Sequence, residues 1–191
     1  MKKKNIVTLM IVVSILGILA FLTIQKDKKY QKNEEQNEPT IKMDFKHFNN
    51  DEFAIKIPET FELMDETILK IKYPAERRPQ IVYTNEDNSI NVAVSILEDE
   101  VESIKEYLEL TKKYLNMLEI KAESEYYEKN NHGIGELKLI SKALNAEIYN
   151  NMMFFEVNGK LRIISFNCTI EQQDEWKKIG DYIIDSLVIY K

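Results

Sequence analysis

The sequence predicts an α+β domain: an antiparallel sheet of about seven strands with helices on its faces, preceded by an N-terminal transmembrane helix. Three observations lead to this fold class. Short segments alternate apolar and polar residues and are separated by turn-forming residues, as the strands of hairpins are. Two longer segments carry apolar residues at the spacing of amphipathic helices. A long uncharged apolar run stands near the N-terminus.

The composition fits one globular domain behind a basic leader. The chain has 191 residues, 44% of them hydrophobic, with only 5 Gly and 4 Pro, which excludes collagen-like and wholly disordered classes. Residues 1–29 hold six lysines and one acid, whereas the chain from Tyr30 onward holds 20 basic and 31 acidic residues, a net charge of −11. Because an acidic body repels phosphate backbones, we expect no nucleic-acid partner.

Residues 6–24 form the apolar run, which is 19 residues long and carries no charge. At about 1.5 Å per residue it spans roughly 28 Å, close to the thickness of the bilayer core. We therefore expect residues 1–25 to be an uncleaved, single-pass signal anchor whose lysine-rich N-terminus stays in the cytoplasm. The alternative is a cleaved signal peptide and a secreted protein, but Ile18 stands where a cleavage site needs a small residue.

The rest of the chain divides into a linker and a folded body. Residues 26–42 are polar and charge-rich, a composition typical of disordered segments. Such a linker has an r.m.s. reach of roughly 20 to 25 Å. Residues 43–191 then form an extracytoplasmic globular domain, tethered to the cell membrane.

The domain begins with β-structure. Residues 53–57 alternate and stop at Pro58, and residues 68–73 alternate before Pro74, so both predict strands. Residues 80–84 and 90–97 flank a turn-rich segment and predict the first hairpin.

An amphipathic helix follows, with apolar residues recurring from Val101 to Leu118. Asp99 and Glu102 have the spacing of a capping box, which predicts the start of this helix. The carboxylates of residues 98–102 suit a helix N-terminus, and they lack the spacing of an EF-hand calcium loop.

Two further hairpins and a second helix complete the domain. Residues 120–130 and 134–142 predict one hairpin, turning at 131–133; residues 147–157 and 160–168 predict another, turning at Asn158-Gly159. Its first strand has apolar side chains on both faces, so we expect these strands to lie centrally with cover on each side. The last helix starts after Thr169, paired with Gln172 as a cap, and buries one apolar stripe: Trp176, Ile179, Ile183 and Leu187.

The run FAIKIPETFEL, followed by ILKIKYP and IVYTNEDNSINVAVSI and closed by a helix ending YIIDSLVIY, resembles the PsbP-like family. The resemblance covers residues 45–190. It implies an α/β/α sandwich, the fold of the extrinsic photosystem II protein and of a Ran-binding nuclear import factor, which also occurs in bacterial secreted or anchored proteins. It further implies a role in binding or assembly, and it transfers no catalytic residue.

The residues themselves indicate no catalytic, cofactor or metal site. The single cysteine, Cys168, excludes an intramolecular disulfide, and with two separated histidines it makes no zinc ligand set. We expect Cys168 to be a buried structural thiol and expect both histidines to be solvated, His47 in a loop and His132 in a turn.

Two pairs of residues are candidates for binding a partner. Arg77 and Arg78 form a basic loop in an acidic domain and are suited to a carboxylate or phosphate. Tyr126 and Tyr127 are adjacent on a polar strand, so their side chains face opposite ways and at least one should be exposed. Tyrosine is enriched in protein interfaces.

We therefore expect a non-enzymatic binding or accessory module for an envelope protein partner; its oligomeric state stays open. A narrower alternative is an immunity or inhibitor protein, whose acidic surface would speed its encounter with a basic toxin. The contrasting alternative is an envelope enzyme whose site is assembled from dispersed residues such as His132, Asp87 and Arg78. An enzyme should place such groups together in a pocket, whereas a binding module should show an exposed patch.

Overall fold

The computed structural model describes residues 40–143 and 146–190. The expected anchor, residues 1–25, and nearly all of the expected linker, residues 26–42, lie outside the described residues. Within the described ranges, no helix is both long and apolar enough to cross a membrane.

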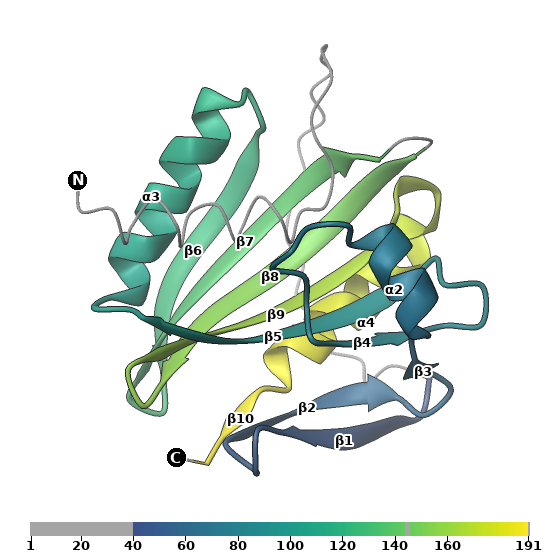
Figure 1. The fold of residues 1–191 in the computed structure, drawn as a ribbon, viewed down its shortest axis with the longest axis horizontal. Helices are drawn as coiled ribbons and strands as arrows, with labels where there is room; N and C mark the ends of the chain where they lie inside the picture. The colour runs from purple at the N-terminus through teal and green to yellow at the C-terminus, as the bar shows by residue number, and fades with distance from the viewer. Residues whose placement is uncertain (1–39, 144–145, 191) are drawn as a thin grey trace.

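The described residues form two antiparallel sheets and three α-helices (Figure 1). The larger sheet has the spatial order β3-β4-β5-β9-β8-β7-β6. Its strands are β3 (Glu62–Leu63), β4 (Ile81–Thr84), β5 (Asn91–Glu100), β6 (Ala122–Lys129), β7 (His132–Lys142), β8 (Glu147–Val157) and β9 (Lys160–Thr169). The smaller sheet, in the order β1-β2-β10, contains β1 (Met43–Phe48), β2 (Phe53–Pro58) and β10 (Val188–Ile189). The helices are α2 (Glu66–Lys72), α3 (Ile104–Met117) and α4 (Gln173–Asp185), the last preceded by a 3₁₀ turn, η1 (Ile170–Gln172).

The helices cover the two faces of the larger sheet, which confirms the α+β class and the seven-stranded antiparallel sheet. α3 packs across β6, β7 and β8 on one face, and α4 packs across β8 and β9 on the other. The small sheet lies on the α4 side, because Phe53 and Ile55 of β2 share a hydrophobic cluster with Ile183 and Ile184 of α4. Figure 1 shows the small sheet as a separate layer beneath the large one.

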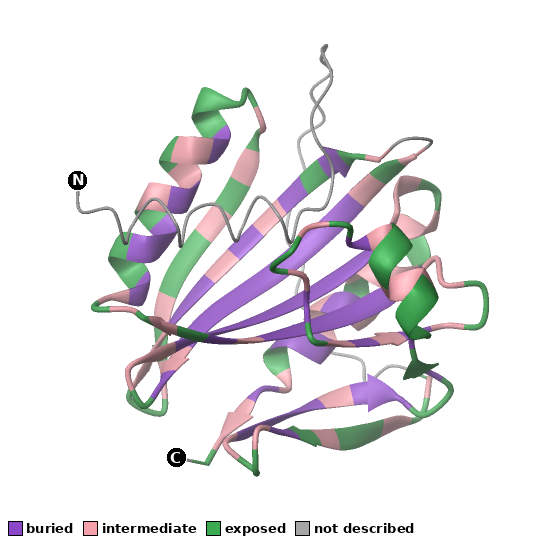
Figure 2. Cartoon of the chain, viewed as in Figure 1, coloured by how far each residue is buried: buried purple, intermediate pink, exposed green. Residues whose placement is uncertain are grey.

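The central position of β8 and β9 is confirmed. Met152 and Phe154 join the hydrophobic cluster under α3, whereas Met153 and Phe155 join the cluster under α4, and all four are fully buried. Figure 2 shows burial concentrated along these middle strands. Alternating side chains of one strand therefore fill two separate cores.

α4 approaches the sheet closely at one glycine. A Cβ atom on Gly180 would lie 2.3 Å from Cδ1 of the Phe166 ring on β9. No real Cβ contact is that short, so the packing of α4 on β9 requires a residue without a side chain at this position.

Both tight hairpin turns use residues that tolerate positive φ. Asn158 and Gly159 have φ of 55° and 77°, which confirms the predicted turn. The preceding hairpin turns at residues 130–131, both asparagines with positive φ, and not at 131–133. His132 is consequently the first residue of β7 and does not lie in a turn.

The prediction of a strand at residues 68–73 is wrong, because residues 68–72 belong to α2 and Tyr73 is its C-cap. The Asp65 carboxylate caps this helix by accepting from the backbone N–H of Thr67, at 2.8 Å, and of Ile68. Ile68 and Leu69 pack against a small cluster that includes Val82. In α2, which has only two turns, apolar and basic residues alternate as they would in a strand. The capping residue Asp65 is therefore the better sequence signal for this helix.

The predicted start of α3 is also wrong. Its N-cap is Ser103, whose Oγ accepts from the backbone N–H of Glu106, and β5 continues to Glu100. The carboxylates assigned to capping instead form ion pairs: Glu98 with Lys160, and Asp99 with Arg77. Pairing of β5 with β9 resumes at Glu100 after a register shift, so the ladder extends the strand past these residues.

The N-terminal strand β1 was not predicted, and His47 lies on it and not in a loop. β1 is an edge strand with alternating polar residues, so its sequence resembles a linker. At the other end of the domain, Thr169 Oγ1 bonds the Gln172 side chain at 3.1 Å but no backbone group, so the predicted cap is not formed. The apolar stripe of α4 is confirmed: Ile183 is fully buried and Trp176 packs against the same cluster.

Candidate protein-binding surface

The four predicted binding residues lie on two separate surfaces. Arg77 and Arg78 are in the loop between α2 and β4, beside one edge of the large sheet. Tyr126 and Tyr127 are on β6, which forms the opposite edge. The two pairs therefore cannot contribute to one compact site.

The arginine loop is held by an internal carboxylate. Arg77 Nη1 lies 3.2 Å from Oδ2 of Asp99 on β5, and this pair connects the loop to the sheet. Arg78 is half-buried, next to the buried Pro79. The Asp99 carboxylate therefore balances the charge of Arg77. An exposed ion pair of this kind stabilises the fold by at most about 1 kcal/mol.

β6 is a free edge of the large sheet, because it pairs with β7 and with no other strand of the described residues. A two-residue turn at 130–131 joins the two strands. Lys129 and His132, which flank this two-residue turn, form a hydrogen-bonded backbone pair. Along the two strands away from the turn, hydrogen-bonded and non-hydrogen-bonded pairs then alternate. By this alternation, the backbone N–H and C=O groups of Ser124 and Tyr126 point away from β7.

Tyr126 is the exposed member of the tyrosine pair, with 37% of its surface accessible. Its ring lies over Gly133 of β7, where a Cβ atom would approach the Tyr126 hydroxyl to 2.8 Å. Lys105 of α3 holds its ammonium 5.9 Å from the ring centroid. The glycine and the lysine thus fix an aromatic side chain on the rim between α3 and the sheet edge.

Tyr127 faces α4, as the alternation of side chains requires, and is half-buried against the larger core. Burial raises the pKa of its hydroxyl, and the nearby carboxylates of Glu136, Asp185 and Glu125 add to this. The expectation that at least one of the two tyrosines is exposed is confirmed by Tyr126.

The β6 edge is acidic. Its eight residues include three exposed glutamates, Glu123, Glu125 and Glu128, and one lysine, Lys129. Lys129 donates to the backbone C=O of Asp185, at 2.7 Å, and so is turned toward the end of α4. The middle of the edge therefore carries more acidic than basic side chains, on a strand whose outer backbone groups pair with no other strand of the described residues.

A polar cluster lies inward of this edge, between α4 and the strands β7 and β8. Asp181 of α4 accepts from Lys138 at 2.9 Å and from Asn151 at 2.8 Å, and Glu136 lies 3.6 Å from Lys138. Burial raises the pKa of Glu136, and the carboxylates of Asp185 and Asp181 reinforce this, although Lys138 opposes it. Sequence spacing could not reveal this cluster, since its members come from three elements.

Two polar atoms of this region have no partner among the described residues: the hydroxyl of Tyr149 and Oδ1 of Asn151. Tyr149 is 4% exposed and Asn151 is fully buried. Burial raises the pKa of the Tyr149 hydroxyl, with Asp181 and Glu136 nearby, so it remains protonated and able to donate.

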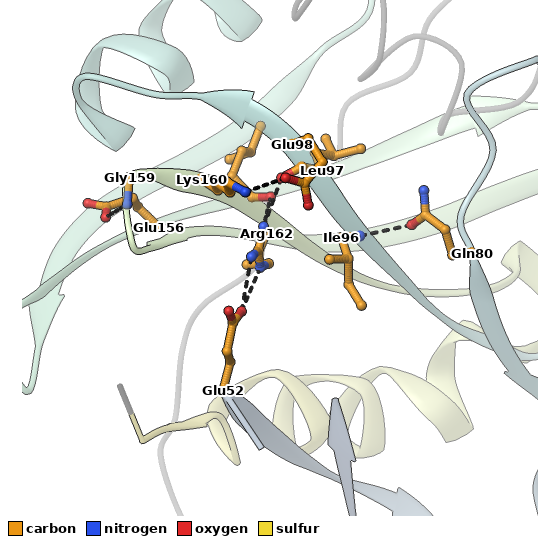
Figure 3. Close-up of polar contacts among 10 residues, drawn as sticks. Glu52, Gln80, Ile96, Leu97, Glu98, Glu156, Gly159, Lys160 and Arg162 are labelled. Carbon is orange, nitrogen blue, oxygen red and sulfur yellow. Dashed lines mark hydrogen bonds and ion pairs between the residues drawn. The ribbon is translucent and has the colours of Figure 1, made fainter. Parts of the chain in front are cut away.

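A second charged contact joins the two sheets. Figure 3 shows the Arg162 guanidinium on β9 pointing toward the Glu52 carboxylate, from the turn between β1 and β2. Arg162 also donates to the backbone C=O of Leu97 at 2.8 Å. Its side chain is 1% exposed, so this pair is a structural connection and is not available to a partner.

This arrangement of layers can be compared with solved structures. The cyanobacterial PsbP protein, CyanoP, of Synechocystis sp. PCC 6803 is 12% identical, with a TM-score of 0.54 over 83% of this chain and 98% of that chain. LpqN of Mycobacterium tuberculosis, described as involved in cell envelope biogenesis, is 10% identical, with a TM-score of 0.52 over 81% of this chain and 94% of that one. The Saccharomyces cerevisiae Ran-binding protein Mog1p aligns with 78% of this chain and 96% of its own, at 13% identity and a TM-score of 0.48.

The chain has the PsbP-like fold. The sequence itself matches no known protein family and no curated protein. The PsbP-like fold inferred from the order of strands and helices is thus confirmed by structure, at sequence identities of 12% and 10%.

Within the PsbP-like domain, the residues weighed as an enzyme site do not meet. His132 follows the β6–β7 turn, at the edge of the sheet opposite to β4. Asp87 lies in the loop after β4, whereas Arg78 precedes β4. The three residues therefore belong to three separate segments: the start of β7, the loop after β4 and the loop before β4.

Cys168 is fully buried on β9 of the PsbP-like domain, as predicted, and burial raises the pKa of its thiol to about 12. Asn167, which begins a glycosylation triplet, is buried too and bonds Asn91 across the sheet at 2.9 Å. His47 is on the outer sheet, with its ring stacked on Tyr190 and Nδ1 3.1 Å from Asp51.

Proposed function

We propose that the protein is a membrane-tethered, extracytoplasmic and non-enzymatic module that binds an envelope protein partner through its β6 edge. In this proposal, residues 6–24 cross the cell membrane with the N-terminus in the cytoplasm, and residues 26–42 tether the PsbP-like domain outside. The partner is a resident envelope protein that the module supports or positions.

The observation that carries the proposal is the β6 edge itself. It is an eight-residue strand with free backbone groups, an exposed and oriented Tyr126, and three exposed glutamates. Exposed strand edges pair readily with other chains, and tyrosine supplies rigid contact area at protein interfaces. The arginine loop is a weaker candidate, because Arg77 already has an internal partner.

The likeness to LpqN supports the envelope as the place of action, since that protein is described as involved in cell envelope biogenesis. The apolar run at residues 6–24 independently favours the same place. Two lines of support, one from the fold and one from the N-terminal sequence, therefore agree.

Site-specific photocrosslinking of the full-length protein in its own cells tests the proposal. A photoreactive amino acid replaces Tyr126, and a matched control replaces Leu63, which is 63% exposed on β3 at the opposite edge of the sheet. We expect one discrete adduct from position 126 and none from position 63. Equal adduct patterns from both positions, or no adduct from position 126, would overturn the proposal.

Mass spectrometry of the adduct then separates the two kinds of binding module. A membrane or envelope protein supports the accessory role. A basic toxin identifies the protein as an immunity or inhibitor protein, for which the acidic edge is equally suited. Protease treatment of intact cells, which should degrade residues 43–191 but spare the N-terminus, tests the orientation.

A further inference from the structure

We infer that the β6 edge binds an extended, basic segment of its partner, which adds to the large sheet as an eighth strand. The inference rests on the proposed function and names the chemistry of the partner. It follows from three properties of β6: the direction of its backbone groups, the sign of its charge, and the alternation of its side chains.

The backbone provides the attachment. The N–H and C=O groups of Ser124 and Tyr126 point outward from the sheet, as the two-residue turn at 130–131 dictates. α3 does not block this side, because it lies across β6, β7 and β8 and is centred over β7. An incoming strand at the usual spacing of about 4.8 Å would continue the sheet.

The charge of β6 disfavours a second copy of this chain as the source of the added strand. Two copies paired edge to edge would bring Glu123, Glu125 and Glu128 of each copy close to the same residues of the other. Like charges on facing strands destabilise a sheet. A basic segment would bring opposite charges to the glutamates of β6, so charge selects a different partner.

The alternation of side chains specifies the pattern of the segment. Glu123 and Glu125 share the α4 face of the sheet with Tyr127, whereas Ser124 and Tyr126 share the α3 face. Lys or Arg at every second position of the added strand would therefore lie beside Glu123 and Glu125. The residues between them would lie beside Tyr126, where apolar or aromatic side chains pack well.

The inference is tested on the full-length protein in lipid nanodiscs with three synthetic peptides. The first alternates Lys and Val over six residues, the second has the same composition in two blocks, and the third alternates Glu and Val. Binding is measured by fluorescence anisotropy, and hydrogen exchange of the β6 amides is followed with each peptide present. We expect the alternating basic peptide to bind about tenfold more tightly than the block peptide, because it alone places each charge on the correct face.

Paired charge reversals locate the effect. Glu123→Lys with Glu125→Lys should weaken binding of the alternating peptide at least about tenfold and remove protection of the β6 amides. Glu59→Lys with Glu62→Lys makes the same change of net charge on β3, at the opposite edge, and in the turn that precedes it, and should leave binding within about twofold. Equal binding of the alternating and block peptides, or unchanged exchange of the β6 amides, would overturn strand addition.

Crosslinking distinguishes failure of the strand-addition inference from failure of the proposed function. If the Glu123→Lys and Glu125→Lys variant still gives the same adduct from position 126 in cells, the basic-strand inference is wrong but the binding module stands. If position 126 gives no adduct in the unaltered protein, the proposed function itself fails.

Discussion

The guanidinium of Arg162, on the central strand β9, bonds Oε2 of Glu52 through Nε at 3.1 Å and Nη2 at 3.0 Å. Glu52 belongs to the turn between β1 and β2, and its backbone C=O accepts from Tyr190 at 2.9 Å. One turn residue therefore connects the small sheet, the C-terminal segment and the core of the large sheet.

Glu52→Ala should lower the free energy of unfolding by about 3 kcal/mol, because it leaves the buried Arg162 charge without its carboxylate. Urea unfolding followed by circular dichroism measures this. Glu62→Ala, at an exposed position on β3, should change stability by less than about 0.5 kcal/mol. A similar small effect at Glu52 would show that the pair contributes nothing to the fold.

Stability should fall in acid through the same carboxylate. Burial alone would raise the pKa of Glu52, but hydrogen bonds from Asn49, Arg162 and Asn158 together hold it below the ordinary value of 4.5. A carboxyl group with a lowered pKa stabilises the fold above its ordinary pKa and loses this effect as the pH falls further. We expect the difference in stability between the unaltered protein and Glu52→Gln to be full at pH 6 and to shrink below pH 4.5.

Glu136 should have the opposite pH dependence. Its pKa is raised above 4.5, chiefly by burial, so the folded state keeps a proton that the unfolded state has already lost. The contribution of Glu136 to stability therefore decreases as the pH rises from 4.5 through the folded pKa. Glu136→Gln should remove this decrease, so the variant gains stability relative to the unaltered protein between pH 5 and pH 7. Curves of unfolding free energy against pH that run parallel for the two proteins would contradict this prediction.

Ser103→Ala should destabilise the domain by about 1 kcal/mol, because it removes the acceptor for the Glu106 N–H at the start of α3. Asp99→Ala tests the position that the sequence pattern favoured and should cost less than Ser103→Ala, because it removes only an exposed ion pair, worth about 0.2 to 1 kcal/mol. Thermal unfolding of both variants shows which of the two substitutions is more destabilising. A larger loss for Asp99→Ala would place the cap there after all.

Gly180→Ala should be more disruptive than its size suggests. The new methyl group would meet the Phe166 ring at about 2.3 Å, so α4 must move outward or the ring must shift. Overpacking of this kind costs about 1 to 3 kcal/mol. Gln173→Ala, at the first residue of α4, is the matched helix control and should have little effect in the same urea titration.

The elements found from sequence were those whose pattern is long enough to be unambiguous. β8 and β9 were identified because both faces are apolar and Asn158-Gly159 closes the turn. α2 was mistaken for a strand because seven residues cannot separate the two periodicities. The cap of α3 was misplaced because β5 extends through Asp99 by pairing with β9, which is a contact distant in sequence.

The site was only partly accessible to sequence reasoning. Strand alternation alone predicted that at least one of Tyr126 and Tyr127 is exposed, but only the structure shows that it is Tyr126. The free edge of β6 required the order of strands in the sheet, and the contacts among Glu136, Lys138 and Asp181 required the packing of α4. The ion pair of Arg77 with Asp99 could not be foreseen, because its partner on β5 lies 22 residues away in the sequence.

The small sheet has a consequence for the order of folding. β2 pairs with its neighbour β1 through a short turn, but it also pairs with β10, where Ala54 lies opposite Val188. The whole seven-stranded sheet and α4 lie between these two residues in the chain. Because closing so long a loop costs entropy until the intervening elements have formed, the ladder between β2 and β10 should be the last to form and the first to open. Amide exchange should then report β10 as the least protected ladder of the domain, opening without loss of the large sheet.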